Sequence, residues 1–472
     1  MSQHKIIEQS LQIDVRPAER NLHYTGYAGT LALRRVWHQL DVDAVLQESA
    51  IHYGKGKDKA PAMSFALAVG PLVEAGSIRR IAQRFGGEAS QQRVEVDPLL
   101  SQIVRRHFDQ RTLDRFVNTE RFSWLRFQQA LVRQLQRFTS TVAADGGVVI
   151  VDDFPIPKPY AEAMAYLSNI WDNNQQRLVR GYTVVHLYYH HPTRPDYSLY
   201  IEPWRKTSAM GETKQKPRRA LRPARPGEQL SKMDMAHQAL AEILPLLPAC
   251  EAVLFDRWYT ARWFGHALTE MGAAWIGECN SLQKFEVFGD YLSVPQIIER
   301  FQAEQIELPG LAGFAAVAMP AILRSDRYTK VDQAVLLVLL TRTIGAEEHT
   351  SLLICNRRQW SALKVVTLYR YRVTIEQCHR QGKQFAGWAD FQTRSWPALQ
   401  AHFAFALLRS LLLALLIAWS KPLQAFSLRR IIAFGIRCIG RIARRSREHI
   451  TLYLPRGQPL VHACYDLSFE ML

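Results

Sequence analysis

Two aspartates stand where they could bind metal ions. Asp152 and Asp256 each close a short apolar run, VVIVD and AVLFD, of the kind that forms buried strands. Carboxylates that converge from separate elements supply the oxygen ligands that divalent cations need for phosphodiester cleavage. A lone acid at a strand end usually marks only a turn, whereas two such acids with a helical glutamate downstream, Glu376, are more specific. The sequence therefore indicates a metal-dependent site built from these three residues.

A helix predicted over about residues 367–384 carries the glutamate. At roughly 100° per residue, one arc of about 60° on this helix holds Tyr369, Arg372, Glu376 and Lys383. The apolar residues between them fall on a different arc, suited to facing a core. Taken alone, the polar stripe favours a solvated face with an Arg372–Glu376 ion pair, worth only a few tenths of a kcal/mol.

The spacing of the stripe, Y-x2-R-x3-E-x6-K, resembles the signature of the insertion sequence 4 family of DDE transposases. The segment LYRYRVTIEQCHRQGK matches all four positions, and GWADFQTRSWPALQAHFAFALL resembles the segment just downstream of the signature in that family. LFDRWYT is similar to the family's D-x-G-Y/F block, with Trp258 where Gly is commoner. IVDDFP is similar to its D-x-T block, with Phe154 in place of the hydroxyl residue. The resemblance covers roughly residues 145–420.

This resemblance implies an RNase H-like catalytic core with an inserted β-rich subdomain, and cut-and-paste transposition through a hairpin at the transposon end. It implies that two Mg²⁺ ions, with Mn²⁺ as a substitute, are held by Asp152, Asp256 and Glu376. Phosphates beside the scissile bond would be held by Tyr369, Arg372 and Lys383. Asp153 stays open as the alternative first ligand, although Asp152 is favoured because it lies directly on the strand. The implied partners are transposon inverted repeats, target DNA and a second copy of the chain.

The net charge of the 472-residue chain is +16, which favours a polyanionic partner, nucleic acid first and an acidic membrane second. A proline-containing segment at 206–229 is rich in Lys and Arg and is either solvated or in contact with DNA; its candidate DNA-binding residues are Arg218, Arg219 and Arg222. A zinc site is not expected, because the six cysteines include no C-x-x-C pair. The Lys-rich segment HYGKGKDKA lacks phosphate-loop spacing, which argues against an ATPase.

Six widely spaced cysteines fit a reducing cytosol, and the polar amino terminus shows no secretory signal. The apolar run at 402–419 is interrupted by Arg409 and is interpreted as a buried helix rather than a membrane span. The expected location is the bacterial cytoplasm, in association with the nucleoid, without a membrane partner.

The expected fold class is a multidomain α+β/α/β protein, with helical DNA-binding regions flanking the catalytic core. Its expected parts are a helical, DNA-binding region at 1–140, the first part of the core at 145–281, a β-rich insertion at 282–350, the second part of the core with the glutamate helix at 351–420, and a basic helical tail at 421–472. Two rival functions remain: a nuclease that cuts DNA without joining it, and a DNA-binding descendant of a transposase without catalysis.

Overall fold

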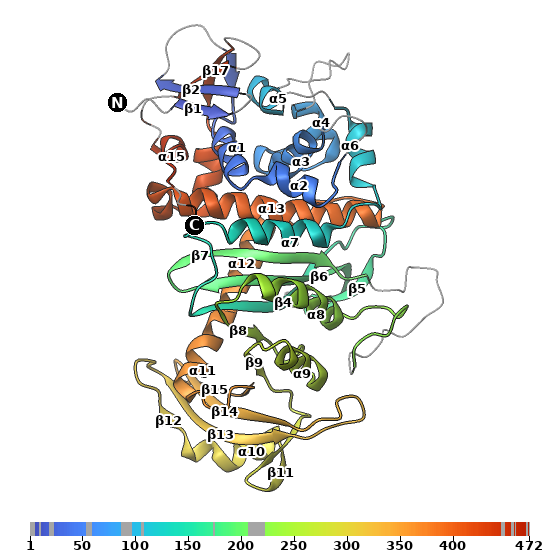
Figure 1. The fold of residues 1–472 in the computed structure, drawn as a ribbon, viewed down its shortest axis with the longest axis vertical. Helices are drawn as coiled ribbons and strands as arrows, with labels where there is room; N and C mark the ends of the chain where they lie inside the picture. The colour runs from blue at the N-terminus through green and yellow to red at the C-terminus, as the bar shows by residue number, and fades with distance from the viewer. Residues whose placement is uncertain are drawn as a thin grey trace. The chain divides into compact units, whose positions relative to one another are not determined.

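The computed structural model contains two compact units (Figure 1). The first comprises Met1–Val142, Tyr160–Ala165 and His379–Leu472, and the second comprises Ala143–Pro159 and Tyr166–Cys378. The residues that the structure describes are 5–8, 11–17, 23–52, 59–85, 97–104, 108–172, 175–205, 222–444, 449–454, 457, 459–468 and 471.

The first unit is built around one long apolar helix, α13 (Trp396–Trp419). Its sixteen buried residues pack against shorter helices on several sides, and aromatic rings on α6 and α7 contact Phe405. Ser395 caps the amino end of α13 by accepting a hydrogen bond from the backbone of Ala398. The other helices of this unit's amino-terminal part are α1 (Thr30–Gln39), α2 (Val42–Glu48), α3 (Lys59–Val69), η1 (Gly70–Val73), α4 (Ile78–Phe85), α5 (Pro98–Val104), α6 (Gln110–Val117) and α7 (Trp124–Leu135).

The first unit also contains a small sheet that the sequence does not lead one to expect. Its strands, in the order β1-β2-β17-β16-β3, are β1 (Lys5–Glu8), β2 (Leu11–Pro17), β17 (His449–Leu454), β16 (Gly440–Arg444) and β3 (His23–Thr25). The amino-terminal region and the tail are therefore not purely helical. Each strand is short, and β17 pairs with β2 from the opposite end of the chain, so no local window of sequence reveals the sheet.

The tail of the first unit continues beyond α13 in short helical segments. They are η5 (Lys421–Ala425), α14 (Leu428–Arg430), the π-helical turn η6 (Ile431–Ile436) and α15 (Pro459–Ala463). Among the described residues, α13 is the single helix long and apolar enough to cross a membrane, with a mean hydropathy of 2.1 over its most apolar window. Because 72% of that window is buried inside the protein, the structure favours the interpretation of α13 as a core helix.

Arg409 lies within α13 and is 1% exposed. Its Nε donates to the carbonyl of Ala68 at 2.6 Å and its Nη2 to that of Leu67 at 3.3 Å, both in the last turn of α3, and its Nη1 donates to the carbonyl of Ala386. Carbonyls at a helix end have no partner within the helix, and a cation there also interacts favourably with the helix dipole. Burial lowers the pKa of Arg409 to about 9. This charge is thus kept inside an apolar helix because it satisfies buried backbone groups.

We predict that Arg409→Met lowers the free energy of unfolding by about 3 kcal/mol or more, because buried carbonyls then lose their donors. Arg429→Met, at an exposed position of the same unit, is the matched control and should change stability by less than about 0.5 kcal/mol. Urea unfolding followed by circular dichroism measures both. Equal unfolding midpoints for the two variants would contradict a structural role for Arg409.

The second unit contains a mixed sheet in the order β11-β10-β13-β14-β15-β9-β8-β4-β6-β5, with β12 beside β13 and β7 beside β6. Near its middle, β4 pairs with β8 in parallel and with β6 antiparallel, and β8 pairs with β9 in parallel. The run VVIVD lies in β4, and AVLFD lies at the end of β8 with Asp256 just beyond it, so both apolar runs form strands as the sequence predicts. The strands of this half are β4 (Gly147–Pro157), β5 (Ser168–Asp172), β6 (Arg177–His191), β7 (Arg194–Pro203), β8 (Cys250–Phe255) and β9 (Trp275–Glu278).

Segment 282–350 is rich in strands, and these strands extend the same sheet. The connection is made by antiparallel pairing of β15 with β9, in which Leu353 lies opposite Glu278. The strands are β10 (Lys284–Val287), β11 (Asp290–Ser293), β12 (Ile306–Glu307), β13 (Phe314–Leu323), β14 (Gln333–Ile344) and β15 (Glu347–Cys355). The helices of the unit are α8 (Lys232–Ile243), η2 (Leu244–Leu246), α9 (Arg262–Glu270), α10 (Val294–Phe301), η3 (Gln302–Glu304), α11 (Ala362–Tyr369), η4 (Arg370–Val373) and the first part of α12 (Thr374–Gln384).

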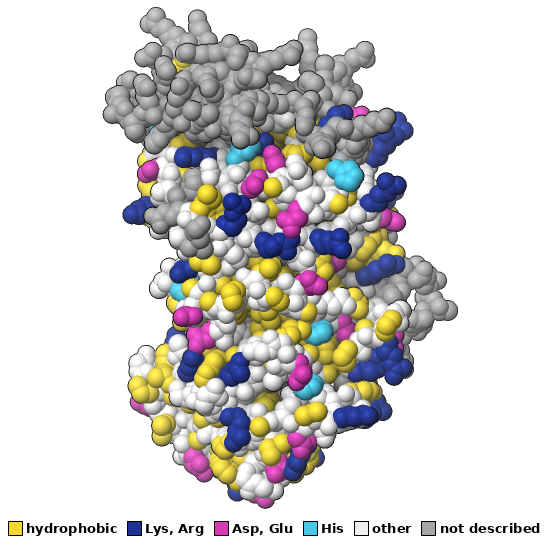
Figure 2. Space-filling model, viewed as in Figure 1, with side chains coloured by type: hydrophobic (Ala, Val, Ile, Leu, Met, Phe, Trp, Pro, Cys, Tyr) yellow, Lys and Arg dark blue, Asp and Glu magenta, His cyan; other side chains and the backbone are white. Residues whose placement is uncertain are grey.

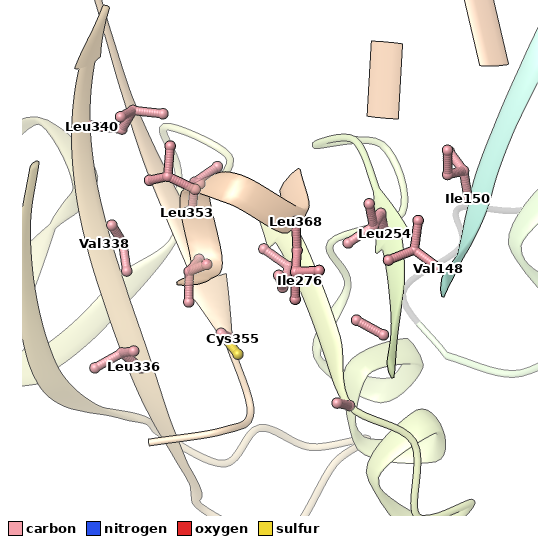
Figure 3. Packing of buried hydrophobic residues seen from close by; sticks show 14 of the residues in the cluster. Val148, Ile150, Leu254, Ile276, Leu336, Val338, Leu340, Leu353, Cys355 and Leu368 are labelled. Atoms are coloured by element: carbon pink, nitrogen blue, oxygen red, sulfur yellow. The ribbon is translucent and has the colours of Figure 1, made fainter. Parts of the chain in front are cut away.

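One face of this sheet carries a continuous apolar cluster (Figure 3). Alternate residues of each strand point to it, among them Val148 and Ile150 of β4 and Leu254 of β8. Leu368 of α11 and Ile375 of α12 are buried in the same cluster. The apolar face predicted for the glutamate helix therefore packs on the sheet, next to the strands that carry the two aspartates.

Candidate active site

Asp152 and Asp256 lie on neighbouring parallel strands. The pairing of β4 with β8 ends at Val151 opposite Phe255, so the next residue on each strand is an aspartate. β4 itself continues to Pro157 along β6, so Asp152 lies at the end of the β4–β8 ladder rather than at the end of its strand. Parallel strands carry both acids to the same edge of the pairing. The sequence prediction that these two acids converge is therefore met by the geometry.

The two carboxyl groups are largely withdrawn from water. Burial raises the pKa of Asp152 to about 7, and the charges of Asp153 and Asp256 add to the effect, while Arg372 opposes it. Burial also raises the pKa of Asp256, against a hydrogen bond from the backbone N–H of Trp258. Crowded, dehydrated acids of this kind are costly to ionise, and such arrangements concentrate at functional sites.

Arg372 connects Asp152 to Glu376. Its Nη1 lies 3.8 Å from Oδ2 of Asp152, and its Nη2 donates to Oε1 of Glu376 at 2.9 Å. The side chain of Glu376 is 47% exposed, whereas that of Arg372 is 24% exposed. The i,i+4 pair that the sequence suggested is thus present, and its arginine also faces the buried acids. The glutamate approaches the aspartates through this guanidinium.

The other residues of the four-residue signature are placed differently. The hydroxyl of Tyr369 donates to the carbonyl of Phe255 at 3.4 Å, next to Asp256, and burial raises the pKa of this phenol. The helix is interrupted after Tyr369 by the 3₁₀ turn η4, so the stripe does not follow one unbroken α-helical period. Lys383 lies on α12 in the part of the chain that belongs to the first unit. Its proposed contact with a phosphate stays a prediction.

Asp153 faces partners of its own. Nζ of Lys232 lies 2.6 Å from its Oδ1, and the hydroxyl of Tyr259 donates to the same oxygen at 3.2 Å. Lys232 is the first residue of α8, and Tyr259 is buried in the turn after β8. Sequence reasoning missed both residues. The only signal for Tyr259 was its place in LFDRWYT, and Lys232 had none beyond its charge.

The remaining predicted site residues lie in the basic segment. Arg222 forms two hydrogen bonds to the carboxylate of Glu228, each 2.7 Å long, and its side chain is 24% exposed. Arg218 and Arg219 lie outside the described residues. The space-filling view shows Lys and Arg side chains spread over one face of the protein, with Asp and Glu among them (Figure 2).

The central region of the chain is similar to one known protein family. The family model described as DDE superfamily endonuclease matches residues 85–292. The matched segment includes Asp152 and Asp256 and ends before the helix that carries Glu376. No curated protein matches the chain. Residues 85–292 are therefore similar to a DDE superfamily endonuclease domain, which supports a transposase-type or nuclease-type domain in this mixed α/β fold.

Endonucleases of this superfamily typically use divalent metal ions and act on DNA. The chemistry of the donors fits such an ion, because Asp152 and Asp256 present adjacent hard oxygen ligands whose mutual repulsion a cation would relieve. Among the described residues, no three His, Cys, Asp or Glu side chains are grouped closely enough to form a metal site. Two of the three predicted ligands are thus side by side, and the third, Glu376, is joined to them by Arg372.

The raised pKa of Asp152 predicts a pH-dependent stability. Its ordinary pKa is 3.8 and the folded value is about 7, so the unfolded chain holds fewer protons at this group between those pH values. Stability should therefore fall as pH rises from about 4 to about 7. Asp152→Asn removes this cost, and we expect it to raise the thermal unfolding midpoint at pH 8 in EDTA, with a gain that shrinks toward pH 4.

The control for this experiment is Asp290→Asn, since Asp290 is exposed and pairs with Arg300 on the surface. It should show no comparable gain at pH 8. A stabilisation by Asp152→Asn that is the same at pH 4 and pH 8 would show that the effect comes from packing rather than from ionisation.

Proposed function

We propose that the protein is a DNA transposase of the insertion sequence 4 type, which cuts transposon ends and joins them to target DNA. The observation that carries the proposal is the placement of Asp152 beside Asp256, with Arg372 facing Asp152 and Glu376 paired to Arg372. Both residues lie on the helix that carries the four-residue signature, Tyr369–Lys383, called the signature helix below. The match to DDE superfamily endonucleases supports the same interpretation. The net charge of +16 suits a protein that binds a polyanion.

The catalytic core is proposed to be RNase H-like. The support is a mixed sheet in which the strands that bear the acids, β4 and β8, are parallel neighbours, with β6 antiparallel beside β4 and helices packed on one face. In such a core the glutamate comes from a helix that lies on the sheet, as α12 does. The region 282–350 is then the β-rich insertion between the second aspartate and the glutamate.

We propose the following roles for the residues of the site. Asp152, Asp256 and Glu376 would hold Mg²⁺, or Mn²⁺, with Asp152 preferred over Asp153 because Lys232 and Tyr259 already engage the latter. Bound there, two ions supply activation of water or a 3′-hydroxyl and stabilise the leaving oxygen. Arg372 would orient a phosphate with its planar fork of donors, and Lys383 would attract one as a point charge. Tyr369 anchors the helix to the end of β8 through the carbonyl of Phe255.

The proposed substrates are terminal inverted repeats and target DNA, and the proposed pathway is cut-and-paste through a hairpin. Two ends must be held together, so the working form is proposed to be a homodimer, in the bacterial cytoplasm at the nucleoid. A nuclease that cuts without joining and a non-catalytic DNA-binding protein remain the rival hypotheses. Purified protein with Mg²⁺ and DNA ends separates them, since the three produce joined product, cut product only, or a complex only.

We expect Asp152→Ala, Asp256→Ala and Glu376→Ala each to reduce Mg²⁺-dependent cleavage of a transposon end to background. Binding of the end should survive, because the basic surfaces are untouched. Gel assays of cleavage and binding on the DNA that flanks the gene measure both. Glu278→Gln is the matched control, because this acid also ends a parallel strand but pairs with Arg257, and it should stay active. If Asp152→Ala cleaves DNA and Asp153→Ala does not, the first metal ligand is Asp153 rather than Asp152.

The signature helix yields a second expectation. Arg372→Gln and Lys383→Gln should slow hairpin formation more than first-strand nicking, because phosphates crowd most where the strand bends sharply. A time course of nicked, hairpin and excised products on a labelled end separates the steps. Arg380→Gln, an exposed arginine on the same helix, controls for the loss of one positive charge. If both steps are slowed equally, Arg372 and Lys383 have only a general electrostatic role. The same conclusion follows if Arg380→Gln has the same effect.

A further inference from the structure

The proposed function leaves one prominent side chain without a role. Trp258 lies two residues beyond Asp256 and is 73% exposed, in a unit where most large rings are buried. The block that LFDRWYT resembles has Gly more often at this position, so the ring is a departure of this chain. We propose that Trp258 is a stacking platform for an unpaired nucleobase next to the scissile phosphate; this inference rests on the proposed function.

The turn after β8 fixes where the ring emerges. The backbone N–H of Trp258 donates to Oδ1 of Asp256 at 2.9 Å, so the backbone that bears the indole is held next to the acid. Its neighbour Tyr259 turns inward, is 1% exposed and donates to Asp153. Tyr259 is thus held inside, and the preceding side chain, Trp258, is exposed to solvent.

One cation lies beside the ring, and a second is its neighbour in sequence. Nζ of Lys232 lies 5.5 Å from the centre of the Trp258 ring while it bonds to Asp153. Arg257, the residue before Trp258 in sequence, has a side chain that is 62% exposed and pairs with Glu278. An aromatic surface next to cations is the combination that binds single-stranded nucleic acid, because bases stack on the ring and phosphates meet the charges.

Trp258 is only two residues from Asp256 in the sequence, and this short separation suits a role in stacking. A phosphate positioned by Asp152 and Asp256 brings its attached nucleotide within reach of a ring whose backbone is bonded to Asp256. Bases inside a duplex have no free face, so the ring selects a base that is unpaired or frayed. Any of the four bases can serve, since every base has a face to stack.

Binding without metal tests the proposal directly. The probes are a labelled 12-nucleotide oligothymidylate and a 12-nucleotide abasic strand with the same phosphates, titrated in EDTA and followed by fluorescence anisotropy. Stacking of one base on one ring corresponds to a preference for the thymidylate strand of about 5-fold or more. Trp258→Ala should abolish that preference without weakening abasic-strand binding. Trp258→Phe should retain part of it.

Trp171→Ala is the matched control, because Trp171 is also exposed, at 50%, but lies on β5 away from the acids in the sheet order. It should leave the preference unchanged. A preference that persists in Trp258→Ala, or an equal loss of both strands, would overturn the proposal. Cleavage with Mg²⁺ is scored separately: a wild-type protein that cuts no DNA end contradicts the proposed function, while the base preference still reports on Trp258.

Discussion

The parallel pairing of β4 with β8 is the constraint on which the site depends. It places Asp152 and Asp256 one residue beyond the last paired residues, Val151 and Phe255. Because side chains alternate along a strand, the same register buries Val148, Ile150 and Leu254 in the cluster under the signature helix. A shift of one strand by one residue would place its aspartate on the opposite face of the sheet from the other aspartate. Packing of the core therefore sets the distance between the acids.

Such crowding of acids requires positive charge nearby, and it comes from helices on the same unit. Arg372 faces Asp152 from the turn before α12, and Lys232 faces Asp153 from the first turn of α8. Even so, burial and repulsion keep the pKa of Asp152 raised to about 7. The fold thus contains an arrangement of acids that lowers its free energy of unfolding at neutral pH. Such a loss of stability is expected at a position where the function of the site, rather than stability, determines which residue is present.

Local features of the sequence predicted much of this arrangement. The runs that became β4 and β8 are short and apolar with an acid at the end, and helical spacing identified the face of α12 that packs at Ile375. Other features depend on contacts between distant residues. Lys232 and Asp153 are 79 residues apart, and Tyr259 and Asp153 are 106 apart, so neither contact has a local signature. The small sheet of the first unit was missed for the same reason, since β2 pairs with β17.

The residues of the polar stripe do not lie on one regular α-helix, although their spacing in the sequence suggests that they do. An ideal helix would present Tyr369, Arg372 and Glu376 together, but the 3₁₀ turn η4 changes the period between them. Tyr369 is directed inward to a carbonyl of β8, Arg372 faces a buried acid, and Glu376 remains 47% exposed. In the proposed reaction Arg372 exchanges a carboxylate partner for a phosphate. Both groups offer a pair of anionic oxygens to the fork of a guanidinium, so this exchange needs no new residue at the site.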